Sequence, residues 1–428
     1  MDCVHKYRLF QNRKQREHLD WVRDTVRQVY NHALHRFNRV PASTGTVRQR
    51  VRQVRDELPA LKDWWTDLIT IYSTVLQEAV ERIETNIHNL GKLKEAGYTV
   101  GSLHWQAPHE YRSFTYRQRG FELDEKSGPT GRGTLTLKKV HGNTLDVPIR
   151  LHRDLPAEAE VKHVTIKKDR TGAWYACFSV ERDTPDKPDP ADIDESNTVG
   201  IDLGICTFIH DSNGRQISRL DLSADRDRLE REQRVLSRKD RGSANWNKQR
   251  RRVADIHKRM RNKKHDFKHK LAAFYTSAYD AVFVEHLNVK SMLEDERNSR
   301  NTAEVGWRDF ISILEHHGRK RGCHVVKVNP ADTTKACNQC GVTTDKPLWV
   351  REHSCPNCGF ETDRDYNAAL NVWKRGLRKL GVVHSEDTPA ETATTVDETH
   401  RESVSASRVV ETGSSCLKEP PKAASRQA

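Results

Sequence analysis

Near the start of the chain, apolar residues recur every three or four positions along two stretches. This spacing places them on one face of a helix, so both stretches predict amphipathic helices that share a core. The residues are Leu19, Val22, Val26, Val29, Tyr30, Ala33 and Phe37 in the first stretch, and Trp65, Leu68, Tyr72, Leu76, Val80, Ile83 and Ile87 in the second. We therefore expect a helical lobe over residues 15–96, with a strand before it at 4–10.

The hydrophobic period then shortens to two, and short alternating runs follow one another with turn signals between several of them. The runs lie at 102–105, 113–116, 120–123, 133–137, 145–149, 164–168 and 174–180. Many short strands of this kind predict a small barrel or sandwich. We assign residues 1–14 and 97–182 to a small β-barrel domain that carries the helical lobe as an insertion. The proline-rich, acidic stretch 183–197 is expected to be a linker.

The second half of the chain has the pattern of an α/β domain, which we place at 198–384. Apolar strands are expected from 199 into a second strand that ends at the turn Asp211-Ser-Asn-Gly214, and at 281–287 and 323–330. Helices are expected at 222–275 and 306–322. Residues 385–428 are rich in Ser, Thr, Ala and Glu with little periodicity, which predicts a disordered tail.

The distribution of charged residues along the chain says more about function than the total charge does. The chain has 73 Lys and Arg against 60 Asp and Glu, a formal charge of +13. Residues 226–270 contain 18 basic and 6 acidic residues, so this segment carries +12, almost the whole excess. A short charge run is usually a solvated helix face. A run of this length repels itself unless a polyanion is present, so we expect it to bind nucleic acid.

The hydropathy pattern also excludes some classes of protein. No stretch approaches the roughly 20 apolar residues that a membrane span requires. The first fifteen residues contain scattered charges and no apolar core of a signal peptide. We expect a cytoplasmic protein with neither a membrane partner nor a small-molecule substrate.

Four of the nine cysteines form two C-x-x-C pairs, Cys337 with Cys340 and Cys355 with Cys358, separated by fourteen residues. Two such knuckles place four thiolates for tetrahedral Zn²⁺, and a site without an open coordination position is structural. Two redox pairs or disulfides are the weaker alternatives, because the knuckles occur in turn-like contexts. His353 could replace one ligand, although four cysteines make it unnecessary.

Three acidic residues occupy positions where acids are not expected. Asp202 lies within an apolar strand, Glu285 ends another, and Asp365 opens a helix just after the second knuckle. Each alone has an ordinary explanation, such as a helix N-cap for Asp365. Together, carboxylates from two strands and a helix can hold two Mg²⁺ or Mn²⁺ ions for phosphodiester cleavage. Asp363 competes as the third ligand; spacing alone does not separate the two aspartates, and the helix and Asn367 that follow favour Asp365.

These motifs resemble those of a known family. G-I-D-L-G around Asp202, V-F-V-E before residue 286, and C-P-N-C-G-F-E-T-D-R-D-Y-N-A-A-L-N-V from Cys355 are similar to the RuvC motifs and zinc ribbon of TnpB proteins, which are transposon-encoded. The resemblance covers residues 1–382 and is weaker in the N-terminal part. Where that family often has Tyr-Thr-Ser before the first cysteine pair, this chain has Asp332-Thr-Thr-Lys335.

The resemblance implies an RNase H-like (RuvC) α/β domain with an inserted zinc ribbon at 330–362, a β-barrel wedge domain and a helical recognition lobe. It also implies an RNA-guided DNA endonuclease, in which a guide RNA pairs with one strand of a double-stranded target DNA and the RuvC domain cuts. Carried over by position, Asp202, Glu285 and Asp365 would be catalytic, and the four cysteines would bind zinc.

Two other classes of protein remain as alternatives. A transposase that transfers strands itself would need a His-apolar-His pair with a nucleophilic tyrosine, and none of the 21 histidines forms His-x-His. A DNA-binding regulator of transposition that does not cleave would be favoured by loss of an acid. All three acids are present.

Overall fold

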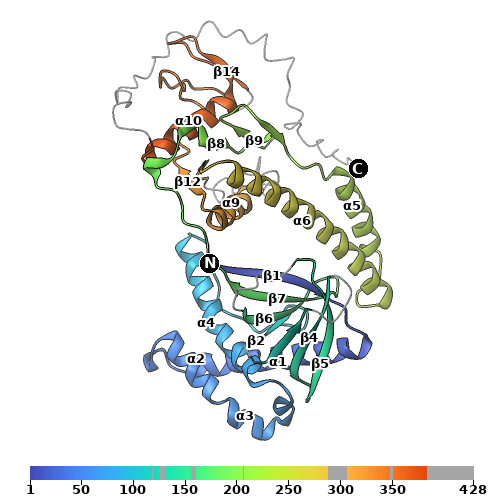
Figure 1. The fold of residues 1–428 in the computed structure, drawn as a ribbon. Helices are drawn as coiled ribbons and strands as arrows, with labels where there is room; N and C mark the ends of the chain where they lie inside the picture. Colours follow the sequence, from blue (N-terminus) through green and yellow to red (C-terminus); the bar gives the residue numbers. More distant parts are fainter. Residues whose placement is uncertain are drawn as a thin grey trace, which may run out of the picture. The chain divides into compact units, whose positions relative to one another are not determined.

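The computed structural model describes residues 1–117, 119–125, 131–153, 155, 161–205, 207–287, 306–347 and 350–382. These residues form two compact units (Figure 1). The first contains residues 1–183 with 232–255, and the second contains 184–231 with the chain from 256 onward. The tail predicted at 385–428 lies outside the described residues.

A seven-stranded antiparallel sheet forms the centre of the first unit, in the order β2-β6-β7-β1-β5-β4-β3. The strands are β1 (Asp2–Leu9), β2 (Ser113–Arg117), β3 (Phe121–Asp124), β4 (Arg132–Val140), β5 (Asn143–Arg150), β6 (Val161–Lys168) and β7 (Trp174–Glu181). The N-terminal strand lies in the middle of the sheet, between β5 and β7. The run predicted as a strand at 102–105 is irregular and mostly exposed, so that prediction was wrong.

The sheet curls until its two edges come together. Its edge strands β2 and β3 are consecutive in the chain, and only residues 118–120 connect them. Four peptide steps span at most about 14 Å. Seven strands laid flat would separate these edges by about 29 Å at 4.8 Å per strand. The short connection is therefore possible only because the sheet approaches a closed barrel.

Four helices pack with this sheet around one core, which includes Tyr7, Val26, Leu76 and Trp174. They are α1 (Arg13–Arg39), α2 (Val47–Asp56), α3 (Leu58–Trp64) and α4 (Ser73–Glu95). α1 begins with a capping box in which Asn12 and Gln15 bond reciprocally. The stretch predicted as one helix at 65–87 is divided: Thr66–Thr70 is a 3₁₀ turn, and the α-helix starts only at Ser73.

The second unit contains a five-stranded mixed sheet in the order β10-β9-β8-β11-β12. The strands are β8 (Thr198–Asp202), β9 (Thr207–Asp211), β10 (Gln216–Ser218), β11 (Ala281–Glu285) and β12 (His324–Val328). β8, β11 and β12 run parallel to one another, whereas β9 is antiparallel to both β8 and β10. The predicted α/β pattern is confirmed for this part of the chain.

Helices cover both faces of this sheet, and alternate strand residues face them. Val199, Ile201, Val282 and Val284 share a core with α9 (Trp307–Arg321) and the end of α6 (Ala244–Ala278). On the opposite face, Ala281 and Phe283 share a core with α10, the helix Arg364–Leu380.

α10 crosses β8, β11 and β12 closely (Figure 1), and two glycines permit this. A Cβ on Gly200 would stand 2.5 Å from the carbonyl oxygen of Ala369, and one on Gly376 would stand 2.0 Å from the ring of Phe283. Neither space admits a methyl group. The close crossing brings the N-terminal end of α10 toward the strand end at Asp202.

The basic segment forms a helical hairpin from α5 (Ser223–Ser237) and α6. At its base, Asp225 pairs with Lys263 at 2.5 Å and with Arg259 at 3.5 Å. Near its turn, Gln249 donates a hydrogen bond to the carbonyl of Glu232 at 3.0 Å. Among the described residues, no helix has the length and apolar character needed to cross a membrane.

Candidate active site

The carboxyl ends of two neighbouring strands bring Asp202 and Glu285 to one edge of the sheet. β8 and β11 are parallel and pair Ile201 with Val284, so the residues that follow reach the same edge together. Strand alternation places both acids on the face that α10 covers, opposite to the face of Ile201 and Val284. Both side chains are buried, with exposed fractions of 7% and 6%.

The N-terminus of α10 supplies the third acid. Asp363 is the N-cap residue: its Oδ1 accepts hydrogen bonds from the backbone N–H groups of Asp365 and Tyr366, at 2.8 and 3.1 Å. The cap is thus made by Asp363, so the carboxylate of Asp365 is not used to cap the helix. Asp365 is buried and lies in the first turn of the helix.

Electrostatics connect the three acids. Burial raises the pKa of Asp202 well above its ordinary value, and the charges of Glu285 and Asp365 raise it further, against an opposing effect of Arg364. Burial also raises the pKa of Glu285, although a hydrogen bond from Thr333 and the charge of Arg375 oppose the rise. Such a group of buried carboxylates is unfavourable without a cation, and it therefore suits a divalent metal ion.

Several partners of these acids were missed in the sequence. The Thr333 hydroxyl donates a hydrogen bond to Oε1 of Glu285. Two guanidinium groups hold Asp365: Arg351 reaches Oδ2 at 3.0 Å, and Arg364 reaches Oδ1 at 3.0 Å. Thr333 lies in the segment where the chain departs from Tyr-Thr-Ser, and no periodicity marks any of these three residues.

A buried histidine at the same edge was also missed. His210 of β9 pairs in register with Asp202. Its Nε2 lies 3.8 Å from Oδ1 of Asp363. His210, Asp363 and Asp365 offer three ligand atoms that all lie within 4.8 Å of one another. Within the described residues only one other group meets this criterion, and Asp202 and Glu285 belong to neither.

The other group is formed by Cys337, Cys340, Cys355 and Cys358. The sulfur atoms of Cys337 and Cys358 are 3.6 Å apart, and those of Cys340 and Cys355 are 3.4 Å apart. Disulfides would need about 2.05 Å. A tetrahedral site with Zn–S bonds of about 2.3 Å has edges of about 3.8 Å. The four thiols are thus arranged for a metal ion.

Side chains of α10 attach the first cysteine knuckle to the helix of Asp365. Asn367 donates a hydrogen bond to the carbonyl of Ala336 at 2.8 Å, and its Oδ1 accepts one from the backbone N–H of Asn338 at 3.0 Å. Asn371 donates to the carbonyls of Thr333 and Ala336 at 2.8 and 2.7 Å. The cysteine cluster and the catalytic candidates therefore share one local scaffold.

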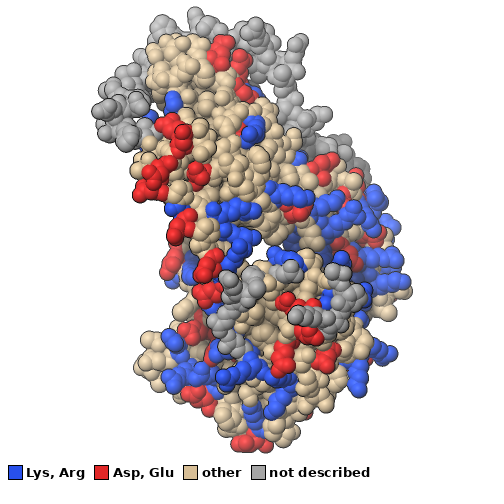
Figure 2. Space-filling model, in the orientation of Figure 1, with Lys and Arg blue, Asp and Glu red and all other residues tan. Residues whose placement is uncertain are grey.

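Figure 2 shows Lys and Arg side chains gathered along α5 and α6. The exposed basic residues there are Arg228, Arg231, Arg234, Arg238, Arg241, Lys248, Arg250, Arg251, Arg252, Arg259, Arg261, Lys263 and Lys270. Their number on one hairpin gives a surface suited to a phosphate backbone.

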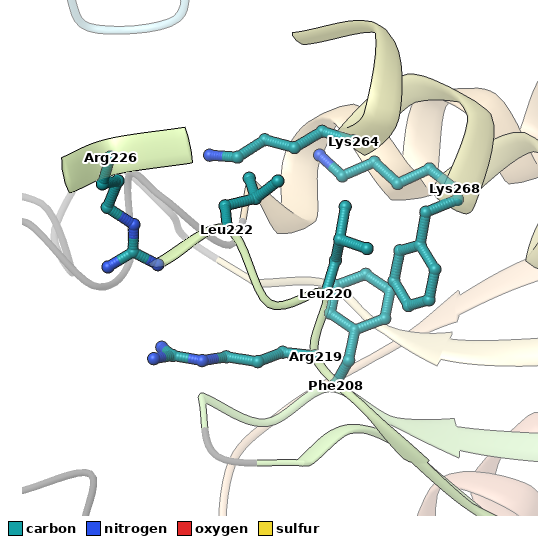
Figure 3. A pocket seen from close by; sticks show the side chains of 8 residues that line it. Phe208, Arg219, Leu220, Leu222, Arg226, Lys264 and Lys268 are labelled. Atoms are coloured by element: carbon teal, nitrogen blue, oxygen red, sulfur yellow. The ribbon is translucent and has the colours of Figure 1, made fainter. Parts of the chain in front are cut away.

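A pocket lies at the base of the hairpin (Figure 3). It is lined by the apolar residues Phe208, Leu220, Leu222 and Phe267 and by the basic residues Arg219, Arg226, Lys264 and Lys268. Lys268 is engaged, since its Nζ donates to the carbonyl of Gly306 at 2.8 Å and pairs with Asp309 at 3.0 Å. The basic character of the hairpin thus continues to its base.

Three family models match the chain. The model described as "Cas12f1-like, TNB domain" matches residues 307–372, "Probable transposase" matches 176–296, and "Helix-turn-helix domain" matches 1–42. In the structure, residues 1–42 contain strand β1, the single α-helix α1 and the start of a 3₁₀ turn, without a second α-helix.

Relatives and a solved structure extend these matches over most of the chain. A Streptomyces pristinaespiralis protein named "Putative RNA-guided DNA endonuclease" is 34% identical over 380 residues, which cover 87% of this chain and 89% of the relative. InsQ of Escherichia coli K12, with the same description, is 28% identical, and the match covers 50% of this chain and 57% of InsQ. The solved Cas12f1–sgRNA–target DNA complex has a TM-score of 0.56 at 16% identity, covering 85% of this chain and 83% of that one.

Proposed function

The chain belongs to the TnpB family, and we propose that it is an RNA-guided DNA endonuclease that cleaves target DNA with Asp202, Glu285 and Asp365. The single observation that carries this proposal is the convergence of the three acids. They come from two parallel strand ends and one helix N-terminus, yet the pKa of Asp202 responds to the charge of both others.

The topology of the second unit supports a RuvC-like assignment. Numbered from its first strand, the sheet has the order 3-2-1-4-5 with the second strand antiparallel, which is the arrangement of RNase H-like domains. In mixed α/β sheets, functional groups collect at the carboxyl ends of the parallel strands. Asp202 and Glu285 occupy such ends, and we propose that the domain is a RuvC nuclease.

The residues fit divalent metal ions, because buried oxygen ligands with mutual repulsion are stabilised by a cation. Asp202, Glu285 and Asp365 would hold the ions. Bound Mg²⁺ or Mn²⁺ supplies an activated water and stabilisation of the leaving oxygen. Thr333 orients Glu285 through a hydrogen bond, and Arg351 and Arg364 position Asp365, so these residues would hold the ligand carboxylates in place.

We further propose that the four-cysteine cluster binds zinc as a structural ion. Four protein thiolates leave no open coordination position for a water or substrate. His353 is not part of the cluster. It is fully buried, its ring centroid lies 6.2 Å from that of Phe360, and burial lowers its pKa to about 4. Reduced thiolates also favour a cytoplasmic location.

The α5–α6 hairpin is the proposed duplex-binding surface. A guide RNA paired with one DNA strand is A-form, and proteins hold it through its backbone and shape. Thirteen exposed cations provide such contacts without base specificity. Specificity would then come from the guide, which distinguishes this proposal from a transposase or regulator that reads DNA itself.

The experiment is cleavage by protein loaded with its copurified RNA. Asp202→Asn should lower the cleavage rate about a hundredfold or more, because a metal ligand is lost, whereas RNA affinity should stay unchanged. Asp192→Asn, at an exposed linker residue, is the matched control and should cut normally. Asp365→Asn should be more severe than Asp363→Asn. Normal cutting by the Asp202 variant would reject the site.

A further inference from the structure

His210 lies beside the acids without an assigned role. Directly paired residues of antiparallel strands project to the same face of a sheet. The pairing of His210 with Asp202 therefore directs the imidazole to the α10 face, where the acids converge. Its exposed fraction is 4%, so the ring is enclosed at the sheet edge.

Neither ring nitrogen of His210 has a hydrogen-bond partner among the residues that the structure describes. A buried polar group without a hydrogen-bond partner is uncommon in native proteins and requires an explanation, such as a bound ion or water. The separation of 3.8 Å between Nε2 and Oδ1 of Asp363 is too long for a hydrogen bond. Two neighbouring ligand atoms of one octahedral ion, each about 2.1 Å from it, lie roughly 3.0 Å apart, so the imidazole and the carboxylate would approach by about 0.8 Å to share an ion.

Asp363 is oriented for this purpose by its capping role. Its Oδ1 accepts the two backbone N–H groups of the first turn of α10, which fixes the carboxylate relative to Asp365. The three candidate ligand atoms of His210, Asp363 and Asp365 lie within 4.8 Å of one another. Arg351 and Arg364 also pair with Asp365, so an ion at this site would share that carboxylate with two guanidinium groups.

We propose that His210 is a nitrogen ligand, with Asp363 and Asp365, for a divalent transition metal at the nuclease site. A nitrogen ligand favours transition-metal ions over Mg²⁺, which prefers oxygen ligands alone, and Mn²⁺ accepts a mixed set of carboxylates with one imidazole. This site therefore binds Mn²⁺ more tightly than Mg²⁺. Metal binding by His210 does not depend on the proposed function. Only the role of this ion in cleavage rests on it.

The test is pulsed EPR of Mn²⁺ bound to the zinc-loaded protein, because coupling to ¹⁴N reports a nitrogen ligand directly. The wild-type protein should show this coupling. His210→Gln should remove it and weaken Mn²⁺ binding roughly tenfold or more, with a smaller change for Mg²⁺. His317→Gln, which alters another buried histidine of the same unit, should retain both the coupling and the affinity.

Asp363→Ser gives a second test that does not alter the buried ring. Serine preserves the helix cap but removes the carboxylate, so Mn²⁺ binding should weaken while thermal stability changes little. Wild-type Mn²⁺ without ¹⁴N coupling, or coupling that persists in His210→Gln, would overturn the inference. If the coupling is absent while Asp202→Asn still abolishes guided cleavage, the His210 ligand is rejected and the proposed function stands.

Discussion

Asn367 of α10 donates its side-chain amide to the carbonyl of Ala336, the residue just before Cys337, at a distance of 2.8 Å. Asn367 is fully buried, so water does not compete for this bond. The helix that carries Asp365 and the knuckle that carries Cys337 are consequently held together. An ion in the cysteine cluster would thus stabilise the position of a catalytic candidate without touching it.

The zinc site should therefore affect both stability and cleavage. Cys355→Ser should lower the zinc content below the expected value of about one ion per chain and lower the melting temperature, since zinc binding contributes folding energy. Cleavage should fall as well, because α10 loses its attachment. Elemental analysis and thermal unfolding measure these effects. Cys177→Ser, outside the cluster in β7, should retain zinc; iron or no metal in the wild-type protein would contradict the assignment.

The close crossing of α10 over the sheet should make Gly376 intolerant of any side chain. Gly376→Ala places a Cβ 2.0 Å from the ring of Phe283 and should lower the unfolding free energy by about 1–3 kcal/mol through overpacking. Gly91→Ala is the matched control, since Gly91 lies in helix α4 with nothing within 4 Å of the added atom. It should stabilise by up to about 1 kcal/mol. Equal effects in denaturant unfolding would mean that α10 does not approach β11 closely.

The folded protein should lose stability below neutral pH because of a buried histidine, His317, at the contact between α6 and α9. His317 bonds to His269 at 2.8 Å and to Arg321, and its surroundings also include His316 and Lys320. Burial and these neighbouring charges lower the pKa of His317 from 6.5 to about 4.

As the pH falls from 7.5 toward 4, the unfolded chain takes up a proton at this histidine that the folded chain does not, so unfolding becomes easier. Denaturant titrations at a series of pH values should show this loss of stability. The loss should be smaller in His317→Gln and unchanged in His88→Gln, which alters an exposed histidine. If the unfolding free energy of His317→Gln depended on pH as it does in the wild-type protein, the assignment of this effect to His317 would be wrong.

The sequence was most informative where one residue type has few explanations. An acid within an apolar strand is costly to bury, so Asp202 and Glu285 could be selected as candidates from the sequence. The two C-x-x-C pairs predicted the cysteine cluster. Strand alternation then predicts which face each residue takes. Register between strands is set by tertiary pairing, however, and the partnership of His210 with Asp202 could not be read from the chain.

Other features depended on contacts distant in sequence. Thr333 meets Glu285 across 48 residues, and no local pattern marks such a partner. The helical period through Trp65 and Leu68 was misleading, because Leu68 is a buried residue of a 3₁₀ turn and continues the spacing of a helix that starts only at Ser73. Short alternation at 102–105 likewise predicted a strand that has no neighbour to pair with in the described sheet.

The most direct test of RNA-guided cleavage is to change the guide. Protein purified with its RNA should cut a DNA target that matches the guide segment, and protein carrying an altered guide should cut the newly matching target instead. RNase-treated protein should bind DNA weakly and in a salt-dependent manner, without cutting at a chosen site, because the exposed cations of α5 and α6 would contact phosphates and not bases. Site-specific cleavage by the RNase-treated protein, or a cut site that does not move with the guide, would contradict RNA-guided cleavage.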